Sequence, residues 1–341
     1  MMEDALMWEK LPDKKVRCNL CHFHCVIPEG KTGICKVRVN VNGELKTILD
    51  SYASSVMIDP IEKKPLYHFY PGTSVLSLGT WSCNFRCKGC QNYELSRTFP
   101  TEETIAKISK KITPEMAVEM AKRYGASGIA WTYNEPTIWF EYTLKSAKLA
   151  KKAGLYTVYV TNGSITEEAL DLIGPYLDAF SVDIKAFSDE SYRKITPIFD
   201  WRKILDTIVY AKTKWNIHIE VVTNVVPTIN DSEEEMRNLA RWIKENLGRK
   251  TPWHITRFFP YLELSHLPPT PIETLEKIHD IGVSEGLEFV YTGNVLGHHY
   301  ENTYCPKCKR LVIRREGFNI VEKHTVNGKC EFCGEDLNIV E

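Results

Sequence analysis

The placement of cysteine constrains this chain more than any other feature, because all eleven cysteines of its 341 residues fall into three tight clusters. The middle cluster has the spacing C-x3-C-x2-C and consists of Cys83, Cys87 and Cys90. Cysteines at such short intervals in a protein of the cytoplasm are typical metal ligands. Three thiolates at this spacing can hold three corners of a cubane iron–sulfur cluster and leave its fourth iron open. The pattern therefore predicts an iron site that can bind and reduce another molecule.

The two outer clusters predict further metal sites. The last one has two C-x2-C pairs that are 21 residues apart, which is typical of a structural zinc ribbon, with a second iron–sulfur cluster as the alternative. The first one has four cysteines within 18 residues, and His22 and His24 lie between them. Four thiolates there can enclose zinc, which we favour, or hold a cluster that relays electrons, and either histidine could replace a cysteine. The ligands expected in the two clusters are Cys18, Cys21, Cys25, Cys35, Cys305, Cys308, Cys330 and Cys333.

Composition narrows the class of protein. The chain has 43 basic and 44 acidic residues, so no net charge favours nucleic acid or an anionic membrane as a partner. An apolar fraction of 43% supports an ordinary globular core. The first residues show no basic and apolar leader, and no apolar run is long enough to span a bilayer. We therefore expect a cytoplasmic protein without a nucleic-acid or membrane partner.

Short apolar segments alternate with amphipathic ones through the middle of the chain. The alternation predicts parallel strands with helical crossovers, in an α/β barrel or an open sheet. Polar motifs recur at the ends of the strands, which favours a barrel or partial barrel. The expected strands are 75–79, 128–132, 157–161, 179–184, 218–226 and 253–258, and the expected helices are 114–124, 136–153, 166–177, 231–246 and 271–285.

Three of these strand ends carry candidate binding residues. Taken singly each has a plain structural explanation, since Glu135 could support the first turn of its helix and Asp183 could cap a helix. Their recurrence in order, after the cysteine loop, indicates one site instead. The candidates are Asn134, Glu135 and Pro136 after the second strand, Thr161, Asn162 and Gly163 after the third, and Asp183 and Lys185 after the fourth.

The cysteine loop at 81–92, with these motifs, resembles the cluster loop of radical S-adenosylmethionine (SAM) enzymes. The resemblance implies a partial (β/α)6 TIM-type barrel and a [4Fe-4S] cluster whose open iron binds SAM. It further implies reductive cleavage of SAM to a 5′-deoxyadenosyl radical that abstracts hydrogen from a substrate. The segment 132–136 is similar to the family's Gly-Gly-Glu-Pro segment, which binds the SAM amino group, and 161–163 would suit the ribose or carboxylate. Residues 181–196 are similar to the Asp-x-Lys region of glycyl-radical-enzyme activating enzymes.

The chain departs from the family pattern at two places. Gly89 stands before the third cysteine where an aromatic residue is usual, so Phe85 or the segment 257–259 would have to supply the contact to adenine. Tyr133 and Asn134 replace the two glycines of the amino-binding segment. Over residues 15–335, including 59–72 and 293–306, the chain resembles the radical SAM component of the AmmeMemoRadiSam system, a pyruvate formate-lyase activating enzyme homologue.

These observations predict an N-terminal cysteine-cluster β domain (1–72), a radical SAM partial barrel (73–297) and a C-terminal zinc ribbon (298–341). The resemblance implies a low-potential electron donor of the ferredoxin or flavodoxin type. The substrate would be a glycyl-radical-type protein, a peptide or a small metabolite. A non-catalytic iron–sulfur and zinc protein, acting as electron carrier or partner scaffold, is the alternative. Four histidines invite a mechanistic role but are more simply explained as hydrogen-bonded residues, namely His68, His254, His298 and His299.

Overall fold

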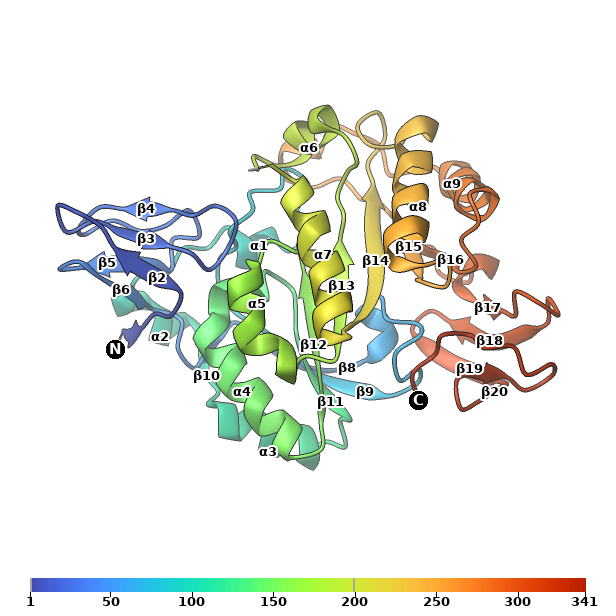
Figure 1. Cartoon of the computed structure of the whole chain (residues 1–341), viewed down its shortest axis with the longest axis horizontal. Coiled ribbons are helices and arrows are strands. Elements are labelled where there is room, and N and C mark those ends of the chain that lie inside the picture. Colours follow the sequence, from blue (N-terminus) through green and yellow to red (C-terminus); the bar gives the residue numbers. More distant parts are fainter. Residues whose placement is uncertain (1, 199) are drawn as a thin grey trace. The chain divides into compact units, whose positions relative to one another are not determined.

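The computed structural model describes residues 2–198 and 200–341 (Figure 1). These residues form two compact units. The first unit contains the residues up to 59 together with 74–180 and 196–217, and the second contains 60–73, 181–195 and 218–341. None of the helices in these described ranges is both long enough and apolar enough to cross a membrane. The three-domain division expected from the sequence stays a prediction.

The central element is an eight-stranded sheet with the strand order β16-β15-β14-β13-β12-β11-β9-β8. The pairs β9–β11, β11–β12, β14–β15 and β15–β16 are parallel. The six strands expected from the sequence are all present, and β8 and β16 are added at the two edges. In chain order the strands are β8 (Ser55–Pro60), β9 (Ser74–Gly79), β11 (Gly128–Trp131), β12 (Tyr156–Thr161), β13 (Ala179–Asp183), β14 (His218–Val225), β15 (Trp253–Arg257) and β16 (Val290–Gly293).

The close approach of β11 and β12 depends on a glycine. Gly128 lies opposite Tyr156 in the parallel register, and a Cβ atom at Gly128 would stand 2.0 Å from the Tyr156 ring. Any larger residue would push the two strands apart, because backbone and ring cannot both give way. The polar loops that follow these two strands are thereby held next to each other.

Helices of the first unit follow the strands as expected. Thr113 caps α3 by accepting the backbone N–H of Met116 at 3.3 Å, and Pro114 opens that helix. Gly125 and Gly154 follow α3 and α4 with φ of +68° and +76°, the left-handed conformation in which glycine ends many helices. Helix α7 was not expected from the sequence. The helices are α1 (Tyr93–Ser96), α2 (Glu102–Ile108), α3 (Pro114–Arg123), α4 (Phe140–Lys152), α5 (Glu167–Ile173) and α7 (Arg202–Trp215), with 3-10 turns η2 (Pro136–Trp139) and η3 (Gly174–Tyr176).

Small antiparallel sheets make up the N-terminal part of the first unit. Asn42 and Gly43 form a tight hairpin turn, since both residues have positive φ, of 55° and 81°, as a two-residue turn requires. The sheets have the strand orders β1-β6-β5, β2-β3-β4 and β10-β7. Their strands are β1 (Glu3–Asp4), β2 (Trp8–Lys10), β3 (Val16–Cys18), β4 (Val26–Ile27), β5 (Arg38–Val41), β6 (Glu44–Thr47), β7 (Tyr52–Ala53) and β10 (Lys110–Lys111).

The second unit ends in a small β ribbon. Phe289, Tyr291, Val312 and Leu337 share a buried core with the ribbon cysteines, so the ribbon is packed onto the region around β16. The helices of this unit are α6 (Asp189–Ile195), α8 (Glu233–Leu247) and α9 (Ile272–Ser284), with η1 (Ile61–Lys63), η4 (Leu262–Leu264) and η5 (His299–Glu301). The ribbon strands are β17 (Thr303–Tyr304), β18 (Leu311–Glu316), β19 (Asn319–Lys323), β20 (Thr325–Val326) and β21 (Lys329–Cys330).

Candidate active site

The loop after β9 carries the three middle cysteines. Cys83 is buried, whereas Cys87 and Cys90 are partly exposed. The Arg86 guanidinium donates to the Cys83 carbonyl at 2.8 Å, and the Arg97 guanidinium donates to the Cys87 carbonyl at 2.9 Å. Two arginines therefore fix the loop backbone and place positive charge beside thiols that must ionise to bind metal.

The surroundings of these thiols favour a metal-bound state. Burial and the nearby Glu135 carboxylate raise the pKa of Cys83 well above its usual range, so this thiol ionises only with a compensating cation. The backbone N–H of Phe85 donates to the Cys83 sulfur at 3.4 Å, and the Ser96 hydroxyl lies 3.3 Å from the Cys90 sulfur. The sulfur atoms of Cys83, Cys87 and Cys90, which all belong to the described residues, do not all lie within 4.8 Å of one another. Three thiolates on one loop could hold three corners of a cubane cluster.

Side-chain amides tie the cysteine loop to the neighbouring strand ends. Asn134 donates to the Ser82 carbonyl at 2.7 Å, and Asn92 donates to the Tyr133 carbonyl, also at 2.7 Å. Asn162 donates to the Asn84 side chain at 2.9 Å. The structure therefore brings the candidates Asn134 and Asn162 to the cysteine loop, with their side-chain amides bonded to that loop.

The Glu135 carboxylate is buried and accepts hydrogen bonds from several neighbouring residues. It accepts hydrogen bonds from the backbone N–H of Asn162 at 2.7 Å, from the Thr161 hydroxyl at 2.8 Å, and from the N–H and hydroxyl of Thr137 at 2.9 and 2.6 Å. Burial raises the pKa of Glu135, and these donors oppose that shift. The carboxylate thus holds together the segments that follow β11 and β12, and Pro136 opens the turn η2 beside it.

Tyr133 keeps the backbone shape that a glycine would have at this position. Its φ is +75°, in the left-handed region that favours glycine, and its hydroxyl donates to the Asp59 carboxylate at 2.8 Å. Gly163 has a φ of +72°, and its N–H donates to the Thr161 hydroxyl at 3.1 Å. The replacement of the expected glycines therefore leaves the polypeptide turn intact, at the cost of strain at Tyr133.

The remaining candidates from the strand ends lie in the second unit. The Lys185 ammonium is 3.0 Å from the Asp183 carboxylate, and both side chains are partly exposed. Asn230 donates to the Lys185 carbonyl at 2.7 Å, which holds the backbone at this point. The pair is thus an ordered, accessible set of opposite charges after β13.

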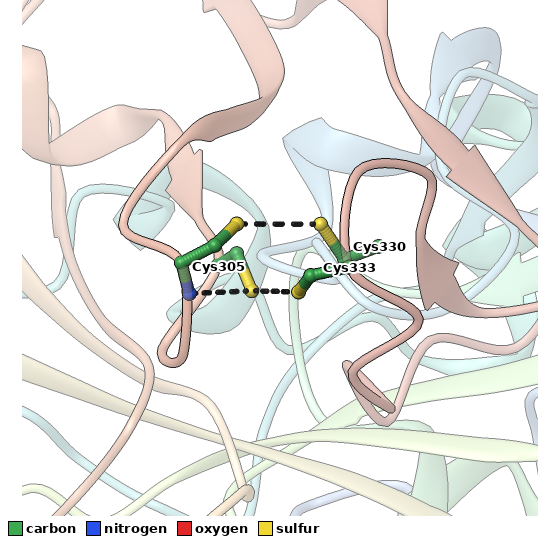
Figure 2. Close-up of side chains that lie close together, drawn as sticks. Cys305, Cys330 and Cys333 are labelled. Carbon is green, nitrogen blue, oxygen red and sulfur yellow. Dashed lines mark hydrogen bonds between the residues drawn. The ribbon is translucent and has the colours of Figure 1, made fainter.

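The ribbon cysteines form a compact four-sulfur group (Figure 2). The Cys305 and Cys333 sulfurs are 3.6 Å apart, those of Cys308 and Cys330 are 3.7 Å apart, and all four lie within 4.8 Å of one another. Tetrahedral zinc with Zn–S bonds of about 2.3 Å requires sulfurs about 3.8 Å apart. These thiols therefore could hold one metal ion, and their separations fit zinc.

The histidines occupy ordinary hydrogen-bonded positions. His254 donates to the buried Glu220 carboxylate at 2.7 Å, and the backbone N–H groups of Tyr67 and His68 donate to the same carboxylate at 2.9 and 2.8 Å. The His298 ring lies 3.1 Å from the Glu276 carboxylate, and the His299 ring stacks near it. Sequence reasoning missed Glu220, although a lone carboxylate within the apolar run of β14 was a signal for a buried polar anchor.

Comparisons with known proteins agree with this arrangement. The family model described as the radical SAM superfamily matches residues 80–243 of this chain. The chain is 43% identical over 341 residues to an uncharacterized protein of Methanocaldococcus jannaschii, covering 99% of this chain and 100% of that protein. It is 26% identical over 171 residues to the pyruvate formate-lyase-activating enzyme of Clostridium pasteurianum, covering 48% of this chain and 66% of that enzyme.

Solved structures support the same fold. A radical SAM methyltransferase from Sphaerobacter thermophilus aligns with a TM-score of 0.50 at 15% identity, over 66% of this chain and 68% of that one. This likeness and the parallel strands confirm the expected α/β fold of the radical SAM kind. Residues 80–243 of this chain form a domain of the radical SAM superfamily, and the chain has relatives among the activating enzymes.

Proposed function

We propose that this chain cleaves SAM reductively at a [4Fe-4S] cluster held by Cys83, Cys87 and Cys90. The observation that carries the proposal is the set of amide hydrogen bonds, from Asn92, Asn134 and Asn162, that bind the cysteine loop to the ends of β11 and β12. The open corner of the cluster and the polar strand ends would thus face a common ligand.

The cluster, when bound, supplies the electron that splits SAM into methionine and a 5′-deoxyadenosyl radical, which then takes a hydrogen atom from the substrate. The chain's own residues would bind and orient SAM. Glu135 already accepts four hydrogen bonds, so we assign it to positioning Thr161 and Asn162 for the ribose or carboxylate. Backbone carbonyls of the segment ending at Pro136 would receive the ammonium group, and Gly163 would leave room for the ligand.

Asp183 and Lys185 remain proposed SAM contacts, supported by the resemblance of their region to activating enzymes. We further propose that the substrate is a glycyl-radical-type protein, because the chain is related to an activating enzyme. The electron would come from a low-potential ferredoxin or flavodoxin. The likeness of 59–72 and 293–306 to the AmmeMemoRadiSam branch supports assignment to that system, and the ribbon is proposed to hold zinc.

A spectroscopic titration tests the proposed site. Anaerobically reconstituted protein, reduced with dithionite, should show a [4Fe-4S]⁺ electron paramagnetic resonance (EPR) signal that shifts when SAM is added. Cys87→Ala should abolish the shift, whereas Lys88→Ala in the same loop should retain it. A signal in the wild-type protein that is indifferent to saturating SAM would favour the non-catalytic electron carrier instead.

A further inference from the structure

The four N-terminal cysteines line one cavity of the first unit, together with Arg38. Cys18, Cys21 and Cys35 are buried and Cys25 is partly so. The side chains of the interleaved histidines do not line this cavity and are engaged elsewhere. The ring of His22 is 2.8 Å from the Thr207 hydroxyl, and that of His24 is 3.2 Å from the Asn19 side chain. The expectation that a histidine could replace a cysteine is therefore not supported, and the site is a set of four thiols.

These four sulfurs are spaced differently from those of the ribbon. Among the described residues, the ribbon group is the only set of three or more possible ligands with all ligand atoms within 4.8 Å of one another. The sulfur–sulfur contacts of 3.6 and 3.7 Å that pair the ribbon cysteines have no counterpart among the described N-terminal thiols. Four thiolates that share one zinc must lie about 3.8 Å apart. Thiolates that each bind a different iron of a cubane must stand further apart, because the irons separate them.

Arg38, which lines the cavity, has two unused hydrogen-bond donors. Arg38 is 1% exposed, and its Nε and Nη1 groups have no hydrogen-bond partner, while its Nη2 group donates to the Glu141 carboxylate at 3.1 Å. The backbone N–H of Ile34 donates to the Cys25 sulfur at 3.5 Å. Buried donors without partners are costly, and inorganic sulfides or thiolates of an anionic cluster would satisfy them.

We propose that Cys18, Cys21, Cys25 and Cys35 hold a second [4Fe-4S] cluster, with one thiolate on each iron. This replaces the zinc ion that the cysteine spacing alone had favoured. Arg38 would donate to the sulfur atoms of that cluster and offset part of its negative charge. Because all four irons then have protein ligands, the cluster is closed and suited to electron transfer.

Two side chains link this site to the loop of the proposed SAM-binding cluster. The Ser82 hydroxyl donates to the Cys35 carbonyl at 2.5 Å, and Ser82 directly precedes Cys83. Arg86 donates to the carbonyls of both Cys83 and Ile34, each at 2.8 Å.

We infer that the N-terminal cluster takes one electron from the low-potential protein donor and passes that electron to the SAM-binding cluster. This relay role rests on the proposed function, whereas the existence of the second cluster does not.

Metal analysis of the full-length protein, purified without oxygen, tests the second cluster. We expect about eight irons and about one zinc per chain. The triple variant Cys83→Ala/Cys87→Ala/Cys90→Ala should keep about four irons and a [4Fe-4S]⁺ EPR signal that SAM does not alter. A wild-type protein with about four irons and about two zincs would overturn the proposal, as would a triple variant with two irons or none.

The relay role is tested by comparing two reductants in one variant, Cys18→Ser/Cys25→Ser. The ratio of SAM cleavage driven by reduced flavodoxin to cleavage driven by dithionite should fall at least about tenfold relative to wild type, because dithionite can reach the SAM-binding cluster directly. An unchanged ratio would refute the relay. Absence of dithionite-driven cleavage in the wild-type protein would instead refute the proposed function, and would leave the metal counts to decide on the second cluster.

Discussion

The backbone N–H of Asn162 donates to the buried carboxylate of Glu135 at 2.7 Å. This bond joins the segments that follow β11 and β12, while the Asn162 side chain holds Asn84 of the cysteine loop at 2.9 Å. One carboxylate thus sets the position of a residue that is itself bonded to the cysteine loop. A substitution of Glu135 should therefore weaken ligand binding more than it disturbs assembly of the cluster.

Glu135→Gln should weaken SAM binding about tenfold, because the amide NH₂ of glutamine would face one of the groups that now donate a hydrogen bond to the carboxylate. A buried donor left without an acceptor costs about 1–3 kcal/mol. Iron content should stay at the wild-type level. The SAM-dependent change in EPR gives the affinity. Thr137→Val, which removes one donor to the same carboxylate and leaves the Asn162 bond, should have a smaller effect. Equal affinities in wild type and Glu135→Gln would contradict the positioning role.

Tyr133 allows a test of backbone strain at the proposed ammonium site. Tyr133→Gly and Tyr133→Val both lose the hydrogen bond to Asp59, but only glycine adopts a φ of +75° without steric strain. The valine variant should therefore be less stable than the glycine variant by about 1 kcal/mol or more, with correspondingly weaker SAM binding. Urea unfolding of the two variants side by side measures the difference. If valine proved as stable as glycine, the left-handed conformation would not be needed for folding.

Removal of the ribbon metal should unfold the ribbon. The backbone N–H of Arg310 lowers the pKa of Cys308 to about 7, so this thiol is ready to ionise at neutral pH. Cys308→Ser should lose about one zinc per chain, and with it binding free energy on the order of 10 kcal/mol. Limited proteolysis should then cut within β18 and β19. The exposed neighbour Lys307 supplies the control, since Lys307→Ala should keep the zinc and the protease resistance. Retained zinc in Cys308→Ser would argue against the four-thiol site.

His68 should make the second unit sensitive to acid. Its ring lies 2.8 Å from the Leu337 carbonyl and 2.6 Å from the Tyr291 hydroxyl. The carbonyl can only accept, so Nδ1 carries the proton and Nε2 accepts from Tyr291. Burial lowers the pKa of His68 from 6.5 to about 3, which means that the unfolded chain binds a proton at a higher pH than the folded one. Stability is therefore fully present above pH 6.5 and is lost as the pH falls toward 3.

Urea unfolding at pH 7.5 and pH 5.5 checks this sign. The wild-type protein should lose about 1.4 kcal/mol from His68 between these two pH values. His68→Gln, which cannot titrate there, should show a pH dependence that is smaller by about that amount. Metal loss and other groups act equally in both proteins, so the difference isolates His68. Parallel pH profiles would show that His68 is protonated as easily when folded as when unfolded.

The sequence predicted the inner strands of the sheet well, because each is a short apolar run that ends in a polar motif. The edge strands were missed for physical reasons. β8 contains Met57 and Ile58, both exposed at a sheet edge, and β16 has only four residues and follows α9 after a short connection. Helix α7 was missed because polar residues such as Thr207 and Lys212 interrupt the apolar pattern of its buried residues Ile204 and Ile208.

The sequence was enough to predict that the cysteine loop and the strand ends lie close together, but not to predict the role of each side chain. Cysteine spacing located the loop, and strand ends located Asn134, Glu135 and Asn162. Whether an amide meets the ligand or the loop backbone depends on tertiary geometry, and the Asn134 amide is bonded to Ser82. Spacing alone also does not distinguish zinc from a second cluster at Cys18, since C-x2-C pairs serve both.

Formation of 5′-deoxyadenosine tests the central claim most directly. Reconstituted protein, given SAM and dithionite without oxygen, should release 5′-deoxyadenosine and methionine in equal amounts. Cys83→Ala, Cys87→Ala and Cys90→Ala should each abolish release, while Cys308→Ser should still release it when assayed below its unfolding temperature. Absence of 5′-deoxyadenosine from wild-type protein whose iron content is complete would contradict the account.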